Sequence, residues 1–482
     1  MKKIILIFLF FLIGLSVNAV NTYYVATAAN GGSDSNPGSN ASPWLTFQKA
    51  ANSAVAGDIV IFKDGTYYYT ISTMVTLSTS GNAGAYITYK AQNKGGAILD
   101  GSSNTATYGI VLSSASYINI EGFTLQYFSH DAIVTVGGNS NSYVNIRDVH
   151  IQFCGRICTD AGANDYSIGI GGTYFHNMNH VVVERCMFND IGRLSPAEGC
   201  STATGTLDFD HGLYIGNCDD WVIKNNIFYN CYRGFGIQLY DSGSGTDSNI
   251  SIINNTFVDG NPFHPAGHII LWTNLSNILI ANNIMDGQIY YGMQLYQAEY
   301  TTSNVVITNN IEYGGNNQLI FYTTLNGVTL SNNHEATNPL FVGRSSHNYH
   351  LTSSSPARDA GYATGITTDY DQYARSGTID IGAFEYVSGV TTYYSAAASG
   401  SATRNNCTAG QTGSSVLYTV PYGTYTSTTS QVAADNLAIA DVTANKQAYA
   451  NANGTCTTVV IHGNLTVGSR LLMDSHGRIQ TR

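Results

Sequence analysis

The sequence predicts an all-β fold, a single-stranded parallel β-helix built from repeated short strands, and two repeats carry that prediction. A phrase in which a polar pair, usually Asn-Asn, lies between two short apolar-alternating segments recurs eight times between residues 119 and 335. A second apolar-alternating segment recurs between these phrases, and five of the seven steps from phrase to phrase span 23 to 29 residues. Alternation with period 2 indicates strands, so each step corresponds to one coil of three short strands.

The polar pair predicts how the coils are held together. Asn residues at the same turn of successive coils can stack their side-chain amides into a ladder that satisfies the backbone groups of the turn. The ladder would account for much of the Asn content of the chain.

Composition limits the class of protein. Charged residues make up only 11% of the 482 residues, against a usual share of about a quarter. The chain holds 20 Lys and Arg against 31 Asp and Glu, a formal charge of −11. With 43% hydrophobic residues the chain is not a disordered polyelectrolyte, and its acidity argues against a nucleic-acid partner.

The first residues predict an exported protein. Lys2 and Lys3 precede an apolar run that ends at Val17, and small residues up to Ala19 follow. This pattern is typical of a Sec-type signal peptide over residues 1–19. No later segment approaches the ~20 apolar residues of a membrane span. We expect a secreted, periplasmic or cell-surface monomer.

Eight cysteines fit an oxidising compartment, and disulfides are favoured over metal ligation because no zinc spacing with His is present. Cys407 and Cys456 are the best-supported pair. The pairing within the other six stays open: Cys154, Cys158, Cys186, Cys200, Cys218 and Cys231.

The two ends of the repeat region carry a family resemblance. YYVATAANGGSDSNPG and SPWLTFQKAANSAVAGDIVIFKDGTYYY (within 23–69) open it, and NPLFVG, SSSPARDAG and DIGAFEY (within 338–386) close it. From about Tyr23 to Tyr386 the chain resembles right-handed parallel β-helix proteins of the pectate-lyase-like superfamily. The resemblance implies a helix at about Thr46–Val55 that caps the solenoid, and a polysaccharide-lyase activity. Such lyases often use Lys or Arg as base on the cleft face, where this sequence has no Lys.

The chain after the repeats predicts a second, small α+β domain. We place the β-helix at 20–387, the small domain at 391–457 and an unassigned tail at 458–482. A helix-like run from Ser430 to Asn453 precedes Gly454, and the region resembles a domain of unknown function in secreted bacterial proteins. About 65 residues are marginal for an independent core, so a disulfide there has a physical purpose.

Strand alternation assigns the faces of the second repeated segment. Inward positions hold apolar pairs such as Leu213 and Ile215, and side chains between them point outward and stack about 4.8 Å apart on successive coils. Three outward columns are expected: Tyr240, Trp272, Tyr296 and Tyr322; then Tyr214, Gln238, Ile270 and Gln294; then Gly212, Gly236, His268 and Gly292. Aromatic and amide groups of this kind suit sugar rings, and an aromatic ladder that only stabilises the sheet is equally consistent.

The other strand predicts a structural column. Glu121, Arg147, Glu184 and Lys224 alternate in charge on adjacent coils, as in a stabilising cross-strand ladder. Lys224 is therefore interpreted as structural rather than as a lyase base.

Two long loops, Cys154–Asp165 and Asp190–Asp210, precede the second segment on neighbouring coils and would build cleft walls. They bring ionisable side chains to the aromatic face: Arg156, Asp160, Asp165, Arg193, Glu198, Asp208, Asp210 and His211. Asp165 and Asp210 are expected at equivalent positions, where close carboxylates can act as acid and base or bind Ca²⁺. Turn-forming Asp is the alternative.

These residues lead to three functional hypotheses. The first is a lyase that cleaves an acidic polysaccharide by β-elimination, with catalytic candidates His211, Asp210, Tyr214, Arg233 and His268. Its substrate-binding candidates are Gln238, Tyr240, Trp272, Gln294, Tyr296 and Arg193, and its calcium ligands would be Asp165, Asp208 and Asp210. The alternatives are a glycoside hydrolase that uses paired Asp residues, and a carbohydrate-binding protein without catalysis.

Overall fold

The chain divides into two compact units, Met1–Arg344 with Tyr349–Tyr386, and Ser345–Asn348 with Val387–Arg482. Each unit is described by itself. The computed structural model describes residues 20–135, 141–157, 173–194, 210–231, 233–241, 245–260, 267–296, 300–322, 325–389, 393–427, 431–458, 471–473 and 479–481.

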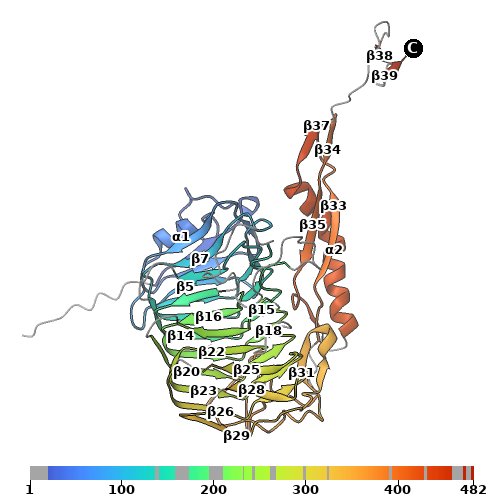
Figure 1. Ribbon diagram of the computed structural model, residues 1–482. Helices are drawn as coiled ribbons and strands as arrows, with labels where there is room; N and C mark the ends of the chain where they lie inside the picture. Colours follow the sequence, from blue (N-terminus) through green and yellow to red (C-terminus); the bar gives the residue numbers. More distant parts are fainter. Residues whose placement is uncertain are drawn as a thin grey trace, which may run out of the picture. The chain divides into compact units, whose positions relative to one another are not determined.

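The first unit is a parallel β-helix, as predicted, in which three long parallel sheets share successive coils (Figure 1). Sheet A holds β1 (Thr22–Val25), β2 (Ile59–Phe62), β5 (Ile87–Ala91), β8 (Ile118–Glu121), β11 (Asn141–Arg147), β14 (Met178–Glu184), β17 (Asp219–Lys224), β20 (Thr246–Ile253), β23 (Asn274–Ala281), β26 (Thr302–Thr308) and β29 (Val328–Ser331). Sheet B holds β3 (Gly65–Tyr68), β6 (Ala97–Asp100), β9 (Thr124–Gln126), β12 (His150–Gln152), β15 (Met187–Asn189), β18 (Ile227–Tyr229), β21 (Thr256–Val258), β24 (Ile284–Asp286) and β27 (Ile311–Tyr313). Sheet C holds β4 (Thr73–Leu77), β7 (Tyr108–Leu112), β10 (Ile133–Thr135), β13 (Thr173–His176), β16 (Leu213–Gly216), β19 (Ile237–Tyr240), β22 (Ile269–Trp272), β25 (Tyr291–Leu295) and β28 (Gln318–Tyr322).

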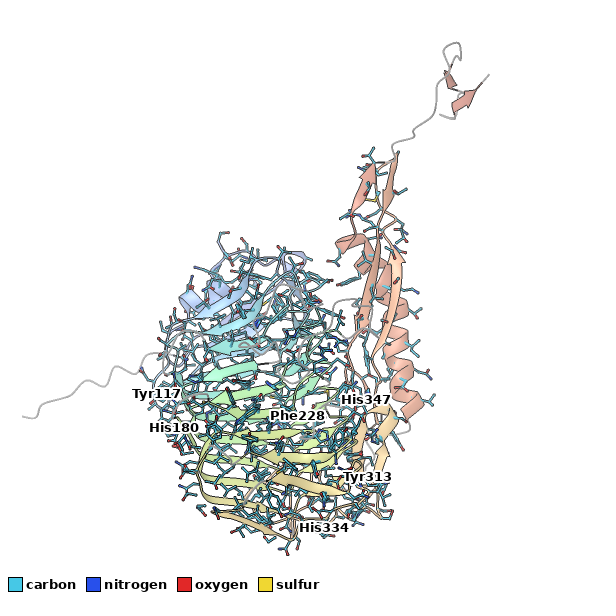
Figure 2. All side chains as sticks on the ribbon, in the orientation of Figure 1. Tyr117, His180, Phe228, Tyr313, His334 and His347 are labelled. Atoms are coloured by element: carbon cyan, nitrogen blue, oxygen red, sulfur yellow. A yellow bond between two sulfur atoms is a disulfide. The ribbon has the colours of Figure 1, made fainter. Side chains whose placement is uncertain are left out.

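Apolar side chains stack inside the coils. Leu213 and Ile215 of β16 are fully buried in the core, which confirms the predicted inward positions. The rings of Phe188, Phe228 and Phe257 stack along the axis, with centroids 4.6 and 4.8 Å apart (Phe228 is labelled in Figure 2). Stacking of like residues on successive coils buries apolar area at every step of the solenoid.

The predicted Asn ladder is confirmed at the turn from sheet A to sheet B. The second Asn of each pair points inward and is hydrogen-bonded to its equivalent on the next coil. The Asn226 Nδ2 donates to the Asn255 Oδ1 at 2.9 Å, and the Asn255 Nδ2 donates to the Asn283 Oδ1 at 3.0 Å. The series continues through Asn310 to Asn333.

The first Asn of each pair has a different role, which the sequence did not reveal. It adopts the left-handed conformation, with φ of 54° at both Asn225 and Asn254. Asn tolerates this conformation better than most residues. Its amide points outward and binds the closing segment of the unit: the Asn225 Nδ2 donates to the Thr368 carbonyl and that of Asn254 to the Asp380 carbonyl.

The N-terminal end is capped by α1 (Phe47–Ser53), which confirms the helix expected at Thr46–Val55. Thr46 caps the helix by accepting a hydrogen bond from the Lys49 backbone nitrogen at 3.0 Å. The buried Phe47 ring lies 4.5 Å from the ring of Phe62 and 5.9 Å from that of Phe123, so the helix closes the apolar interior. The remaining short elements before residue 387 are η1 (Ala28–Asn30), β30 (Phe341–Gly343), η3 (Arg344–Ser346) and β31 (Asn348–Leu351).

On the coil that follows β12, the strand of sheet C does not lie where the sequence repeats predicted it. SIGIG at 167–171 was expected as its sheet C strand, but that strand is β13, Thr173–His176, in which Tyr174 pairs with Tyr214. The segment 167–171 and Asp165 both lie outside the described residues, so the expected equivalence of Asp165 and Asp210 stays a prediction.

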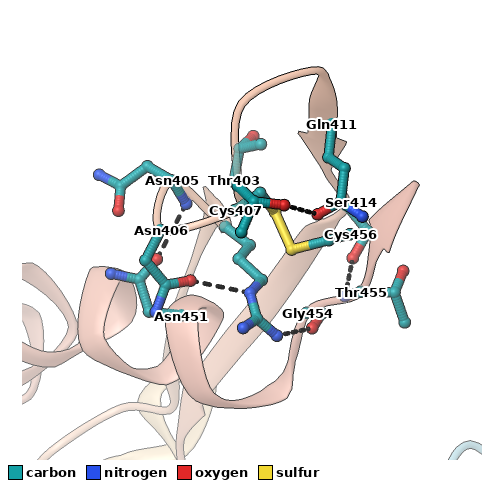
Figure 3. The surroundings of a disulfide bond; sticks show 12 residues. Thr403, Asn405, Asn406, Cys407, Gln411, Ser414, Asn451, Gly454, Thr455 and Cys456 are labelled. Atoms are coloured by element: carbon teal, nitrogen blue, oxygen red, sulfur yellow. Dashed lines mark hydrogen bonds between the residues drawn. A yellow bond between two sulfur atoms is a disulfide. The ribbon is translucent and has the colours of Figure 1, made fainter. Parts of the chain in front are cut away.

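The second unit packs one helix on antiparallel strands. Helix α2 (Gln431–Asn453) packs on β33 (Ala398–Thr403) and β35 (Ser415–Val420), and its small core includes Val420, Ala438 and Val442. The Cys407–Cys456 disulfide is confirmed at the end of this unit (Figure 3). The remaining strands are β32 (Tyr393–Tyr394), β34 (Gln411–Gly413), β36 (Thr426–Ser427), β37 (Cys456–Thr458), β38 (Leu471–Met473) and β39 (Ile479–Thr481).

The remaining described cysteines are free thiols. Cys154, Cys186, Cys218 and Cys231 are all buried in the β-helix, so the disulfide interpretation is wrong for these four. Burial raises the pKa of the Cys154 and Cys186 thiols to about 12, which keeps them protonated and unreactive. Cys158 and Cys200 lie outside the described residues.

No helix among the described residues is long and apolar enough to cross a membrane. The predicted signal peptide, residues 1–19, lies outside the described part of the chain and stays a prediction.

Candidate functional site

An aromatic row crosses the outer face of sheet C. We use this name for Tyr214, Tyr240, Trp272 and Tyr296, which come from four successive strands or strand ends. Ring centroids are 6.3 Å apart from Tyr214 to Tyr240, 5.7 Å from Tyr240 to Trp272 and 4.8 Å from Trp272 to Tyr296. All four side chains are half-buried, so the row keeps contact with solvent.

The row does not continue to Tyr322. The register pairs Leu295 with Tyr322 and Gln294 with Phe321, one residue away from the alignment expected for this strand. Since successive residues alternate between faces, a shift of one residue takes Tyr322 out of the outward column.

Two amides lie beside the row in the neighbouring outward column, as predicted. Gln238 pairs with Ile270, and Ile270 with Gln294, on successive strands. The two glutamines are 6% and 7% exposed, and the Oε1 atom of each accepts no hydrogen bond from the described residues. The Trp272 Nε1 likewise has no acceptor among them. Buried polar atoms usually have partners, so these three atoms are exceptions to the rule, and they lie beneath the row rather than on its surface.

Arg193 and Asp210 form a buried ion pair on the rim between sheets B and C. The Asp210 carboxylate accepts from the Arg193 Nε at 3.0 Å, from its Nη2 at 2.9 Å and from its backbone nitrogen at 2.8 Å. The two side chains are only 7% and 1% exposed. Both Asp210 carboxylate oxygens therefore accept hydrogen bonds from Arg193, and the ion pair holds the chain in place at the rim.

This pairing does not fit the predicted calcium site. A Ca²⁺ ion needs several oxygen ligands, but Asp210 is neutralised by Arg193. The described residues contain no group of three or more His, Cys, Asp or Glu residues that could hold a metal. Asp165 and Asp208, the other predicted ligands, lie outside the described residues, as do Asp160 and Glu198.

His211 joins this rim to the aromatic row. Its ring lies 5.4 Å from the Tyr214 ring and 5.4 Å from the Phe235 ring. The Phe235 backbone nitrogen donates to the His211 Nδ1 at 3.1 Å. Because Nδ1 is an acceptor, the ring proton of the neutral imidazole lies on Nε2. His211 is 1% exposed, so it too is held in one orientation.

Arg233 completes a rim cluster that we define as Arg193, Asp210, His211 and Arg233. The Arg233 carbonyl accepts from the Asp210 backbone nitrogen at 3.0 Å, and the residue is 2% exposed. Gly192 makes this packing feasible, since a Cβ there would lie 2.7 Å from the Cβ of Asp210 and 3.0 Å from that of Arg233. Its φ of 101° also favours glycine.

His268 has its contacts elsewhere, and the third outward column is wrong. The His268 ring lies 5.7 Å from the core residue Phe257, and its Nε2 lies 3.2 Å from the Asp286 carbonyl. Burial lowers the His268 pKa to about 4, so the ring stays neutral. A Cβ at Gly236 would touch the same Phe257 ring at 2.8 Å, which shows that this column turns inward at the strand start.

The charged column on sheet A is a ladder, as predicted. Glu184 pairs with Arg147 at 3.3 Å and with Lys224 at 3.2 Å, and Arg147 reaches Glu121 at 3.8 Å. Lys224 therefore acts in strand-to-strand pairing on a sheet that carries no part of the aromatic row.

The sequence interpretation missed a second rim group, Tyr108, His130 and Asp131. The His130 Nδ1 lies 2.8 Å from the Asp131 Oδ2, and the His130 ring lies 5.2 Å from the Tyr108 ring. A signal was present: His-Asp stands directly before AIV at 132–134, and Asp-His stands directly before GLYI at 212–215.

Comparisons with known proteins agree with this architecture. Residues 23–179 match the family described as Pel9A-like, right handed beta helix region, and residues 210–355 match the family described as right handed beta helix region. Residues 393–457 match DUF5977, a family of unknown function. The chain is 25% identical over 379 residues to the uncharacterized protein YwoF of Bacillus subtilis (strain 168), covering 64% of this chain and 79% of YwoF.

Two solved structures are similar to this chain at low sequence identity. The crystal structure of pectate lyase Pel9A has 18% identity and a TM-score of 0.47, covering 77% of this chain and 97% of that chain. The GH136 lacto-N-biosidase from Eubacterium ramulus has 12% identity and a TM-score of 0.41, covering 65% and 63%. The chain thus has a right-handed parallel β-helix region, as the sequence predicted, followed by a small domain that matches the DUF5977 family model.

Proposed function

We propose that the protein binds an acidic polysaccharide along the aromatic row and cleaves it by β-elimination at the rim beside the row. The observation that carries the proposal is the contact between Tyr214, the last ring of the row, and His211 of the rim cluster. It joins a surface suited to sugars to a group of ionisable side chains. The match to Pel9A-like regions agrees with a lyase.

The row supplies the binding surface. Sugar rings pack their apolar faces on aromatic side chains, and half-buried rings on successive coils offer such faces along the solenoid axis. Beside them, the Gln238 and Gln294 amides stand in the neighbouring outward column, where amide groups can donate to and accept from hydroxyl groups. A polysaccharide that lies parallel to the axis would meet both kinds of group.

The rim supplies the polar groups that β-elimination requires. In this reaction a base removes the C5 proton of a uronate, the C4–C5 double bond forms, and the oxygen on C4 leaves with a proton from an acid. Arg233 brings a guanidinium group to the rim cluster, and a cation near the uronate carboxylate would favour the reaction. The His211 Nε2 carries a proton and is a donor, so His211 in this tautomer does not serve as the base.

A hydrolase mechanism receives less support from the rim. Inverting and retaining glycosidases use two carboxyl groups that flank the scissile bond. Asp210, the described member of the predicted pair, is 1% exposed and has both oxygens hydrogen-bonded to Arg193.

Binding without cleavage is the second candidate function. The observation that favours it is burial: Asp210, His211 and Arg233 are each at most 2% exposed, whereas the aromatic row is open to solvent. In that case the row alone would contact the polysaccharide and the rim cluster would be a structural support.

The test uses the full chain with polygalacturonate, alginate, chondroitin and hyaluronan. A lyase produces the ultraviolet absorbance of an unsaturated uronate, and a hydrolase produces reducing ends without it. Trp272→Ala should weaken binding of the cleaved polysaccharide by about 10-fold, the loss expected for one stacking aromatic ring. Tyr143→Ala is the matched control, since Tyr143 stacks on Tyr117 in sheet A, away from the row.

The outcomes separate the candidates. Unsaturated product that depends on Trp272 and not on Tyr143 supports the proposal. Binding without any product supports the second candidate. Equal binding by the wild type and Trp272→Ala would place the ligand on another surface and contradict both.

A further inference from the structure

Two dipeptides occupy the same coil position on the rim in reversed order. Strand β10 pairs with β13 and β13 with β16, in a register that aligns Ile133 with Leu213. His130 and Asp210 each stand three residues before these aligned positions, and Asp131 and His211 each stand two residues before them. At ~4.8 Å per strand, the two dipeptides lie about 10 Å apart along the axis.

The two histidines are held in opposite tautomers. The His130 Nδ1 lies 2.8 Å from the Asp131 Oδ2, and because an ionised carboxylate only accepts, Nδ1 donates to it. The proton that His130 can gain or lose is therefore on Nε2. In His211 the Phe235 backbone nitrogen donates to Nδ1, so Nε2 keeps its proton. Only the first arrangement provides a base.

His130 is also the more accessible of the two. Its side chain is 16% exposed, whereas His211 is 1% exposed. The His130 ring lies 5.2 Å from that of Tyr108, a half-buried residue at the start of β7. An imidazole and a phenol thus lie side by side at the rim of sheet C.

The electrostatic surroundings suit a base and an acid. Burial lowers the pKa of His130, and the charge of Arg193 lowers it further. The hydrogen bond and charge of Asp131, together with the charge of Asp210, outweigh both effects, so the His130 pKa is raised above 6.5. Burial and then the charge of Asp131 raise the Tyr108 pKa, so the phenol stays protonated. The groups that act on His130 are therefore Tyr108, Asp131, Asp210 and Arg193.

We propose that His130 is the base and Tyr108 the acid of the β-elimination, with Asp131 as the residue that positions His130. This inference rests on the function proposed above. The neutral His130 Nε2 takes the C5 proton, the C–H electron pair forms the C4–C5 double bond, and the C4–O bond breaks. The leaving oxygen takes the proton of the Tyr108 hydroxyl, and exchange with solvent restores both groups. No oxidant, reductant or metal enters the balance.

A purely structural His–Asp pair is the alternative, and the chain contains one for comparison. The His180 Nδ1 lies 3.0 Å from the Asp220 Oδ2, and the His180 ring stacks on Tyr143 in sheet A (His180 is labelled in Figure 2). This pair has the same chemistry on a different sheet.

The experiment measures the initial rate of unsaturated product, polysaccharide binding and thermal unfolding for His130→Gln, Tyr108→Phe and Asp131→Asn, with His180→Gln as control. Each of the first two substitutions should lower the rate by about 100-fold, the range of one general acid or base, with binding within about 3-fold of the wild type. His180→Gln should leave the rate unchanged.

The pH profile tests the role of Asp131. The base must be deprotonated, so the rate rises as pH increases through the His130 pKa. Asp131 raises that pKa, so Asp131→Asn should move the acidic limb of the profile to lower pH. A residue that only stabilises the rim would lower the rate without moving the limb.

The outcomes distinguish this inference from the proposed function. If His130→Gln keeps the wild-type rate, or His180→Gln loses as much, the inference is wrong while the lyase function stands. If the wild type yields no unsaturated product from any of the four polysaccharides, both are wrong.

Discussion

Asn226 and Asn255 stand one coil apart inside the β-helix, and the Asn226 side-chain nitrogen donates to the Asn255 Oδ1 at 2.9 Å. The same oxygen accepts from the Asn226 backbone nitrogen, and the Asn255 Nδ2 donates to the Ile223 carbonyl at 3.0 Å. Both residues are fully buried. Each inward Asn therefore satisfies backbone groups on its neighbouring coils, and the ladder depends on the amide having both a donor and an acceptor.

Asn255→Asp should destabilise the β-helix by about 2–4 kcal/mol, because it replaces a buried donor with an oxygen that faces the Ile223 carbonyl and the Asn283 Oδ1. Protonation of the new carboxyl restores a donor, so its folded-state pKa is raised. The loss should therefore be small at acidic pH and grow as pH rises. Thermal unfolding at several pH values measures it.

The control is Asn277→Asp in the exposed ladder of sheet A, where the Asn277 Nδ2 donates to the Asn249 Oδ1 at 3.1 Å. Solvent replaces a lost hydrogen bond there, so the effect should stay within about 0.5 kcal/mol. If the two substitutions lower the free energy of unfolding equally, burial is not the reason why the inward ladder stabilises the β-helix.

Lys224→Met tests the structural assignment of the sheet A cation. Lys224 Nζ lies 3.2 Å from Glu184, which also pairs with Arg147 and Arg185. Removal of one partially exposed partner should cost about 0–1 kcal/mol and leave the rate of polysaccharide cleavage within about 2-fold. A loss of activity greater than about 10-fold at unchanged stability would make Lys224 a catalytic base after all.

Much of the fold could be predicted because each repeat carries its own local signals. Alternation placed Leu213 and Ile215 in the core, the polar pair placed the Asn ladder, and the charge pattern placed Lys224 beside Glu184. All of these depend on residues at fixed distances along the chain, which a regular coil converts into contacts between neighbouring coils.

The candidate site was less accessible from the sequence, since it depends on long connections and register. The Asp210 carboxylate was expected to be available to a metal or substrate, but Arg193, seventeen residues before it, binds both oxygens. His130 was missed for two reasons. Its partner, Asp131, is the next residue in the chain, so no long-range pattern marks the pair. The equivalence of its position with that of Asp210 is visible only when the strand register aligns Ile133 with Leu213. The docking of Thr368 on Asn225 spans 143 residues and has no local signal.

Asp247→Asn should change the pH dependence of stability. Asp247 is fully buried in β20, its Oδ1 accepts from the Cys218 backbone nitrogen at 2.7 Å, and its Oδ2 has no partner among the described residues. Burial, with a smaller effect of Asp241, raises its pKa to about 7 against the lowering effect of the Cys218 hydrogen bond. Folding therefore takes up a proton between about pH 4 and 7.

For such a group, stability is greatest below the unfolded-state pKa and declines as pH rises towards the folded-state pKa. Asn has the shape of the protonated acid and does not ionise, so Asp247→Asn should gain stability over the wild type at pH 8 and little at pH 4. Asp220→Asn, at a half-exposed carboxylate on the neighbouring strand, is the control and should show no such gain. A gain of equal size at both pH values would contradict the prediction.

Cys407→Ser with Cys456→Ser should destabilise the second unit by about 2–4 kcal/mol, because the disulfide closes a loop of 49 residues around a small core. Other contacts near the ends of this loop are the pairing of β34 with β37 and hydrogen bonds such as that from the Asn405 backbone nitrogen to the Asn451 Oδ1 at 2.9 Å (Figure 3). Helix α2 lies within the loop and should lose its amide hydrogen-exchange protection first. The amides of sheets A, B and C should keep theirs, because the described cysteines of that unit are free thiols.

Reductant should reproduce the effect in the wild type and add nothing in the double variant. Unchanged protection of α2 in both would show that the small core is sufficient without the disulfide.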